Sequence, residues 1–175
     1  MKREILTTPN PELRKKSQSV TAFDKSLENL VIDLTETLEA QTNPPGLGLS
    51  APQIGVLKRV FVARIRNRVK GFTNPVIRKF SKNEIAYLEG CFSVPLLYGH
   101  VTRPAEIELE SQEITGKKNT KTYKGLPARI IQHEVDHLDG TLFTDHIHDQ
   151  NGKLFKVEKD KKGKESLVEV DGMGK

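Results

Sequence analysis

Apolar residues recur at steps of three and four over residues 24–41, a pattern typical of an amphipathic helix. Asp24 stands directly before this stretch, and an aspartate there accepts hydrogen bonds from the first free N–H groups of a helix. We therefore predict a helix that starts after Asp24 and packs one face against a core. That face is made of Leu27, Leu30, Val31, Leu34 and Leu38.

A second helical period runs through residues 125–138, GLPARIIQHEVDHL. Pro127 fits the first turn of a helix, where its missing N–H has no partner, and Gly140 lies just past the expected end. The apolar positions spread over much of the circumference, which indicates a buried helix. They are Ile130, Ile131, Val135 and Leu138.

Alternating apolar and polar residues predict strands at 59–65 (RVFVARI) and 105–110 (AEIELE). Residues 84–95, EIAYLEGCFSVP, predict a strand that breaks at Gly90, and the proline- and glycine-rich residues 43–55 predict a loop. These elements favour an α+β fold, in which mostly antiparallel sheets pack around a central helix, the one at 125–138.

One domain is expected over residues 1–175, because this length suits a single sizeable core. Within it, residues 151–175 hold two alternating segments around the charged turn KDKKGK. They predict a hairpin or a loosely ordered basic tail.

Composition narrows the class of protein. The net charge of +5 is modest and is most simply a solvated surface; a basic face that touches RNA is the alternative. Without tryptophan or basic residues interleaved with aromatic ones, no specific nucleic acid partner is expected.

The N-terminus lacks the pattern of a signal peptide, and no run reaches the roughly 18 apolar residues of a membrane span, so no membrane partner is expected. The single cysteine, Cys91, excludes an intramolecular disulfide and is typical of a reducing cytoplasm.

The candidate chemistry lies in the second helix, as the pattern HEVDH. His133 and His137 are four residues apart, so their side chains lie one turn apart on one face, where both imidazoles can bind one metal ion. Glu134 lies about 100° further round the helix and can act on water at the metal. The alternative is a solvated helix face, but burying these polar groups without a partner is costly, which favours a metal.

A catalytic site usually has three protein ligands, so a third ligand is needed. The candidates are Cys91, the other histidines, and a downstream acid such as Glu158. A lone cysteine is often just a small buried apolar residue, but Cys91 lies at a glycine-marked strand break, where backbone approaches ligands closely.

Three separated motifs together resemble those of the peptide deformylase family. They are GLGLSAPQ at 46–53, EGCFS at 89–93 and QHEVDHLDG at 132–140, and the resemblance runs from about Ile5 to about Ile147. It implies a cytoplasmic, metal-dependent hydrolase of protein biosynthesis. The implied reaction removes the N-terminal formyl group from the formyl-methionine of newly synthesised proteins and releases formate.

The resemblance also implies a role for each matching residue. Cys91, His133 and His137 would bind one divalent metal ion, with Fe2+ expected and Zn2+, Ni2+ or Co2+ able to replace it. Glu134 would be the catalytic acid and base. The side-chain amide of Gln53 and the backbone N–H of Phe92 would stabilise the oxyanion.

Substrate contacts follow from the same resemblance. Gly48 would pair with the substrate backbone, while Leu47, Leu49 and Ile130 either line a methionine pocket or belong to the core. Glu89 and Arg103 would form a supporting ion pair. Asp136 has no assigned role beyond orienting a ligand indirectly.

The chain departs from the family pattern in three places. Phe92 stands where leucine is usual, and Ser50 where alanine is usual. The hairpin-like end replaces the basic helix with which many bacterial members dock at the ribosome, so only a transient ribosome contact is expected. The partners are N-formylmethionyl nascent peptides, and a monomer is expected.

Two other functions compete with this interpretation. A zinc metallopeptidase with the same HExxH chemistry and a later acidic ligand predicts that Cys91 is dispensable for metal binding. A metal-stabilised binding protein attracted to ribosomal RNA predicts that Glu134→Ala leaves function intact.

Overall fold

The computed structural model describes residues 1–159 and 165–170. Its helices in these ranges include three α-helices and two short 3₁₀ helices. They are η1 (Pro11–Arg14), α1 (Lys25–Glu39), η2 (Ala51–Ile54), α2 (Leu126–Leu138) and α3 (Phe143–Asp149).

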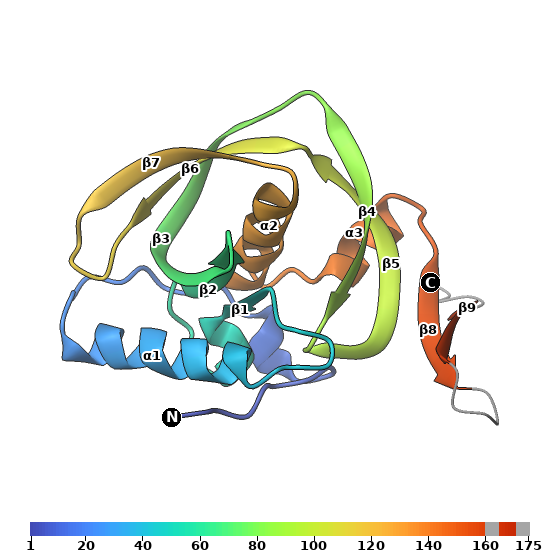
Figure 1. The fold of residues 1–175 in the computed structure, drawn as a ribbon, viewed down its shortest axis with the longest axis horizontal. Coiled ribbons are helices and arrows are strands. Elements are labelled where there is room, and N and C mark those ends of the chain that lie inside the picture. The colour runs from blue at the N-terminus through green and yellow to red at the C-terminus, as the bar shows by residue number, and fades with distance from the viewer. Residues whose placement is uncertain (160–164, 171–175) are drawn as a thin grey trace.

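The strands form two sheets whose neighbours all pair antiparallel. A five-stranded sheet has the order β1 (Gly48–Ser50), β2 (Val60–Ile65), β3 (Arg68–Phe80), β6 (Glu106–Gln112) and β7 (Lys118–Lys124). A four-stranded sheet has the order β4 (Glu84–Cys91), β5 (Val94–Pro104), β8 (Leu154–Lys159) and β9 (Glu165–Glu169). In Figure 1, α2 lies between the β2–β3 side and the β4–β5 side, which confirms the predicted α+β fold around a central helix.

The predicted helix over residues 24–41 is α1, and its cap is confirmed. The Asp24 carboxylate accepts hydrogen bonds from the N–H groups of Ser26 and Leu27 at 2.9 and 3.3 Å. The leucine stripe of α1 packs in one core cluster with β1 and β2. The helix therefore supports the outer face of the sheet edge that carries β1.

The second predicted helix is α2, and both faces of its middle turns are enclosed. Ile131 and Leu138 are fully buried in a cluster with Phe61 and Ile107 of the five-stranded sheet. Gly140 ends the helix with a φ of 75°, and a Cβ there would lie 2.4 Å from the carbonyl oxygen of Arg14. Only glycine fits this left-handed position against the N-terminal segment.

Two predictions about the shorter elements are wrong. Residues 43–55 are not simply a loop, because they contain the three-residue strand β1 and the helix η2. The strand over 84–95 does not end at Gly90: it continues to Cys91, turns at Phe92 and Ser93, and returns as β5. The pairing shifts register between Gly90 and Cys91, so the glycine marks an irregularity within the strand.

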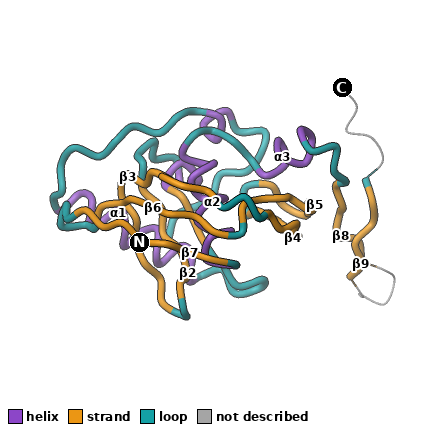
Figure 2. Tube along the Cα trace, turned by 90° about the horizontal axis from the view of Figure 1, so that it is seen from above, coloured by secondary structure: helices purple, strands orange, loops and turns teal. Residues whose placement is uncertain are grey.

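The C-terminal region adds β8 to the edge of β5, and β9 pairs with β8 (Figures 1 and 2). Most of the charged turn KDKKGK falls at 160–164, outside the described residues. Helix α3 precedes this region and buries Phe143 and Ile147 against β5 and β8 in a third cluster. Among the described residues, no helix has the length and apolar character needed to cross a bilayer.

Candidate metal centre and active site

Helix α2 presents His133 and His137 to the same point in space, as their four-residue spacing predicts. Their ring centroids lie 5.0 Å apart, with the rings nearly perpendicular. His137 is buried, and His133 is slightly exposed toward a cleft. The packing of Ile131 and Leu138 against the five-stranded sheet turns both rings toward the cleft side of α2.

Cys91, at the end of β4, supplies the third candidate ligand. Its Sγ atom lies 3.2 Å from Nε2 of His137. The ligand atoms of Cys91, His133 and His137 all lie within 4.8 Å of one another, and no other such group of His, Cys, Asp or Glu occurs within residues 1–159 and 165–170. Glu158 is an exposed residue of β8, so Cys91 is the third ligand that the geometry favours.

The three donor groups fit one divalent ion of the zinc and iron class. Protein ligands bind such ions at roughly 2.0–2.3 Å, so two ligand atoms on one ion lie within about 4.6 Å of each other. Burial raises the pKa of the Cys91 thiol, but the imidazoles of His137 and His133 outweigh it and hold the pKa well below its usual value. A thiolate with two imidazoles suits a borderline-soft metal and not magnesium or calcium.

Glu89 fixes the orientation of His133. Its Oε2 atom lies 2.9 Å from Nδ1 of His133, which leaves the Nε2 atom facing the other ligands. Such a carboxylate partner sets both the tautomer and the angle of a ligating ring. The expected pair with Arg103 is present, because Arg103 binds both oxygens of Glu89 at 2.7 and 3.0 Å.

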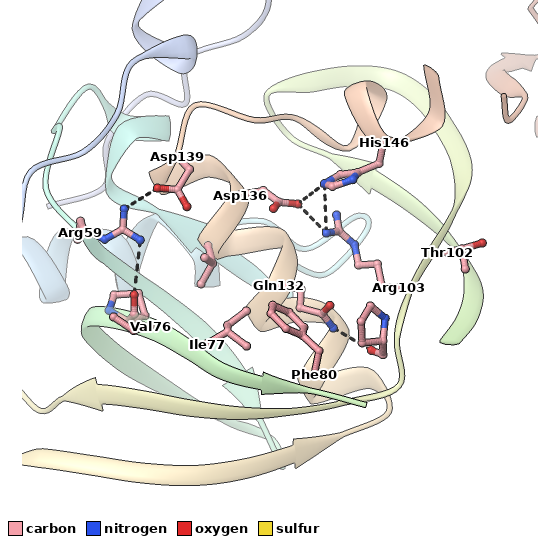
Figure 3. A pocket seen from close by; sticks show the side chains of 13 residues that line it. Arg59, Val76, Ile77, Phe80, Thr102, Arg103, Gln132, Asp136, Asp139 and His146 are labelled. Carbon is pink, nitrogen blue, oxygen red and sulfur yellow. Dashed lines mark hydrogen bonds and ion pairs between the residues drawn. The ribbon is translucent and has the colours of Figure 1, made fainter. Parts of the chain in front are cut away.

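The same cluster explains Asp136, which had no clear role in the sequence. Its Oδ2 atom binds Nη1 of Arg103 at 2.6 Å and Nε2 of His146 at 2.8 Å, as Figure 3 shows. Asp136 is therefore linked to the ligand His133 by three successive contacts, through Arg103 and Glu89. Asp136, Arg103 and His146 line a second pocket of about 510 Å³, on the other side of α2 from the cleft at the ligands.

Sequence reasoning missed two members of this cluster. Arg129 binds Oε1 of Glu89 at 2.8 Å and the carbonyl oxygen of Val101 at 2.8 Å. The signal for Arg129 is an arginine on a helix that is predicted to be buried, one turn before His133. His146 lies on α3, and no spacing in the sequence connects it to Asp136.

Glu134 lies next to the ligands with its carboxylate almost fully buried. Burial raises the pKa of this carboxyl, while the two imidazoles and a hydrogen bond from Ser50 oppose the shift. A carboxylate with a raised pKa is closer to the operating pH and therefore better suited to exchanging protons.

Gln53 and Phe92 flank the same space. The side-chain oxygen of Gln53 accepts the N–H of Ser50 at 2.8 Å, which turns its amide nitrogen toward Cys91 Sγ at 3.4 Å and Ser93 Oγ at 3.1 Å. Phe92 lies in the turn after Cys91, and no described residue accepts a hydrogen bond from its backbone N–H. The backbone N–H of Phe92 is thus available beside the ligands, and the amide nitrogen of Gln53 lies there in contact with Cys91 and Ser93.

The ligands open into a cleft of about 440 Å³ with a largely apolar wall. Leu47, Gly48, Ile130, Gln53 and Phe92 line it, together with Cys91, His133 and Glu134. Leu49 does not: it is fully buried in the core cluster with α1, because alternate residues of β1 face opposite sides. Leu49 is therefore a core residue.

The two histidines of an HExxH motif lie on one helix, a cysteine completes the ligand set, and a buried glutamate lies beside them. This fold and site define the chain as a metal-dependent hydrolase. The sequence model of the family described as Polypeptide deformylase matches residues 2–153. The chain belongs to this family.

Relatives and solved structures agree with that assignment. A peptide deformylase of Phenylobacterium zucineum is 43% identical over 150 residues, which cover 83% of this chain and 87% of that protein. The crystal structure of a peptide deformylase from Legionella pneumophila aligns with a TM-score of 0.78 and 37% identity, over 83% of this chain and 86% of that one. The peptide deformylase structure from Thermotoga maritima gives a TM-score of 0.79 at 32% identity, over 83% and 97% of the two chains.

Proposed function

We propose that this chain hydrolyses the formyl group from the N-terminal formyl-methionine of newly synthesised proteins and releases formate. The observation that carries the proposal is the convergence of Cys91, His133 and His137 within 4.8 Å, beside the buried Glu134 and at the base of an apolar cleft. The family to which the chain belongs supports the same reaction.

The ligand residues would hold one divalent ion. We expect Fe2+, which Zn2+, Ni2+ or Co2+ can replace. Such an ion acts as a Lewis acid toward the formyl carbonyl and makes water more acidic. Cys91 contributes the thiolate that the lowered pKa of its thiol favours. A thiolate ligand requires a reduced cysteine, which suits a reducing cytoplasm.

Glu134 is the proton carrier in this proposal. Its carboxylate takes a proton from the attacking water and later delivers it to the departing amine, so that the formamide bond breaks and formate and a free amino terminus form. Gln53, through its amide nitrogen, and Phe92, through its backbone N–H, donate hydrogen bonds to the oxyanion that develops on the formyl oxygen.

The cleft provides the substrate contacts. The backbone of Gly48, at the edge of β1, pairs with the backbone of the nascent peptide, and the side chains of Leu47 and Ile130 contact the methionine side chain. The apolar wall supports this choice, because burial of a methionine side chain contributes roughly 1.5–3 kcal/mol.

Assembly and docking belong to the same proposal. We infer one domain that acts as a monomer and contacts the ribosome transiently. The β8–β9 pairing at the edge of β5 supports the inclusion of the C-terminal region in that domain.

The test is anaerobic purification, metal analysis, and an assay on a formyl-methionyl peptide, with the same peptide lacking the formyl group as the control. The proposal predicts formate release from the first peptide and no cleavage of a peptide bond in either. Peptide-bond cleavage without formate release would favour the HExxH zinc metallopeptidase instead. An inactive protein that still binds RNA would favour the binding protein.

A further inference from the structure

Strand β1 touches the Glu134 carboxylate with two of its three residues. A Cβ atom on Gly48 would lie 2.3 Å from Oε1 of Glu134, so the bare glycine is what leaves room for that oxygen. The hydroxyl of Ser50 lies 2.5 Å from Oε2. One strand therefore contacts both oxygens of the carboxylate, from two positions on the same face.

Ser50 is the one hydrogen-bond donor to the Glu134 carboxylate among the described residues. The serine is fully buried and Glu134 nearly so, which excludes bulk water as an easy substitute. A buried carboxylate with a single donor depends on that donor for its orientation.

The same hydroxyl has a second acceptor, the main-chain oxygen of Glu134 at 3.0 Å. A serine hydroxyl carries one proton and can accept as well as donate. The carboxylate Oε2 at 2.5 Å is the closer acceptor, and the main-chain oxygen of Glu134 keeps the serine hydroxyl beside helix α2.

We propose that Ser50 is a positioning residue that holds the Glu134 carboxylate in one orientation beside the candidate metal ligands. This inference rests on the proposed function, in which Glu134 carries the proton. No covalent bond to Ser50 forms or breaks.

The substitution Ser50→Ala isolates this hydroxyl. The backbone N–H of Ser50, which binds the side-chain oxygen of Gln53 at 2.8 Å, stays in place. We expect kcat to fall about tenfold, the scale of one hydrogen bond to a charged group, with KM and metal content unchanged. Ser17→Ala is the matched control, because Ser17 has a buried hydroxyl with no partner among the described residues, and kcat should not change.

A double-mutant cycle with Glu134→Asp separates positioning from a general structural role. The shorter aspartate withdraws the carboxylate from Ser50, so adding Ser50→Ala to Glu134→Asp should lower kcat by less than twofold. A crystal structure of Ser50→Ala should also show the Glu134 carboxylate in a different or mixed orientation. If Ser50→Ala does not fold, Ser50→Cys keeps the volume with a weaker donor and replaces it in the cycle.

Two results would overturn the inference: a kcat of Ser50→Ala equal to that of the unsubstituted protein, or equal losses in both backgrounds of the cycle. Formate release by the unsubstituted protein is measured first. If that release is absent, the proposed function fails; if it is present and the losses are additive, only the role of Ser50 fails.

Discussion

The carboxylate of Glu89 binds Nδ1 of His133 at 2.9 Å and, through its two oxygens, also the guanidinium groups of Arg103 and Arg129. One buried anion thus contacts two buried cations, one of which also pairs with Asp136, and sets the ring of a candidate metal ligand. The orientation of His133 and the packing of β4, β5 and α2 depend on the same side chain.

Replacing Glu89 with glutamine should therefore damage stability and metal affinity together. The change removes the anion that Arg129 pairs with and leaves Arg103 with Asp136 alone, which costs on the order of 3–5 kcal/mol in the free energy of unfolding. Loss of the partner of His133 should weaken metal binding roughly 10–100-fold. Urea denaturation and competition with a chelator measure the two effects.

Glu110→Gln is the matched control for stability. Glu110 pairs with Arg78 at 2.9 Å on the exposed part of the five-stranded sheet, where such a pair is worth less than about 1 kcal/mol. Equal losses in the two variants would contradict the structural role of Glu89.

Asp136→Asn should have a smaller effect of the same kind. It weakens the contacts of Asp136 with Arg103 and His146 but leaves the bond between Glu89 and His133 intact. We expect metal affinity to fall less than tenfold, below the loss for Glu89→Gln. A larger loss for Asp136→Asn would mean that Asp136 reaches the ligands by another route.

Cys91→Ala should abolish stable metal binding, because it removes the anionic member of a three-ligand site. Glu158→Ala should leave the metal content unchanged, since Glu158 is an exposed residue of β8. Elemental analysis of the anaerobically purified variants shows whether Cys91 or Glu158 is the third ligand. Metal loss on substitution of Glu158, with retention in Cys91→Ala, would support the metallopeptidase.

Gln53→Ala should reduce turnover far more than stability. Loss of one oxyanion donor typically lowers kcat by roughly 10²–10³-fold. Steady-state kinetics and thermal melting measure the two effects. Gln150→Ala is the control: Gln150 bonds the backbone of Thr102 from a surface position, so kcat should not change. A large fall in melting temperature with little change in kcat would assign Gln53 to the fold instead.

Local patterns in the sequence predicted the local parts of this molecule. The period of α1 with its Asp24 cap, and the four-residue spacing of His133 and His137, are encoded within a few turns of helix. Cys91 is 42 residues before His133 along the chain, and only its motif indicated it as a ligand. Spacing alone left the other histidines and a downstream acid such as Glu158 as further candidates.

Contacts between distant elements could not be predicted from the sequence. Arg103, Asp136 and His146 meet because β5, α2 and α3 pack together, and no periodicity encodes that packing. Leu49 could not be assigned to core or pocket for a different reason. Its place in the core follows from the two-residue period of β1, but the glycines and prolines around it indicated a loop.

The three-residue length of β1 limits which insertions this chain can accept. A one-residue slip would bring the Leu49 side chain to the face where Gly48 and Ser50 meet Glu134. The pairing of Gly48 with Ala63 and of Ser50 with Phe61 opposes that slip. A single residue added between Gly48 and Gln53 would therefore separate the proton carrier from the oxyanion donor.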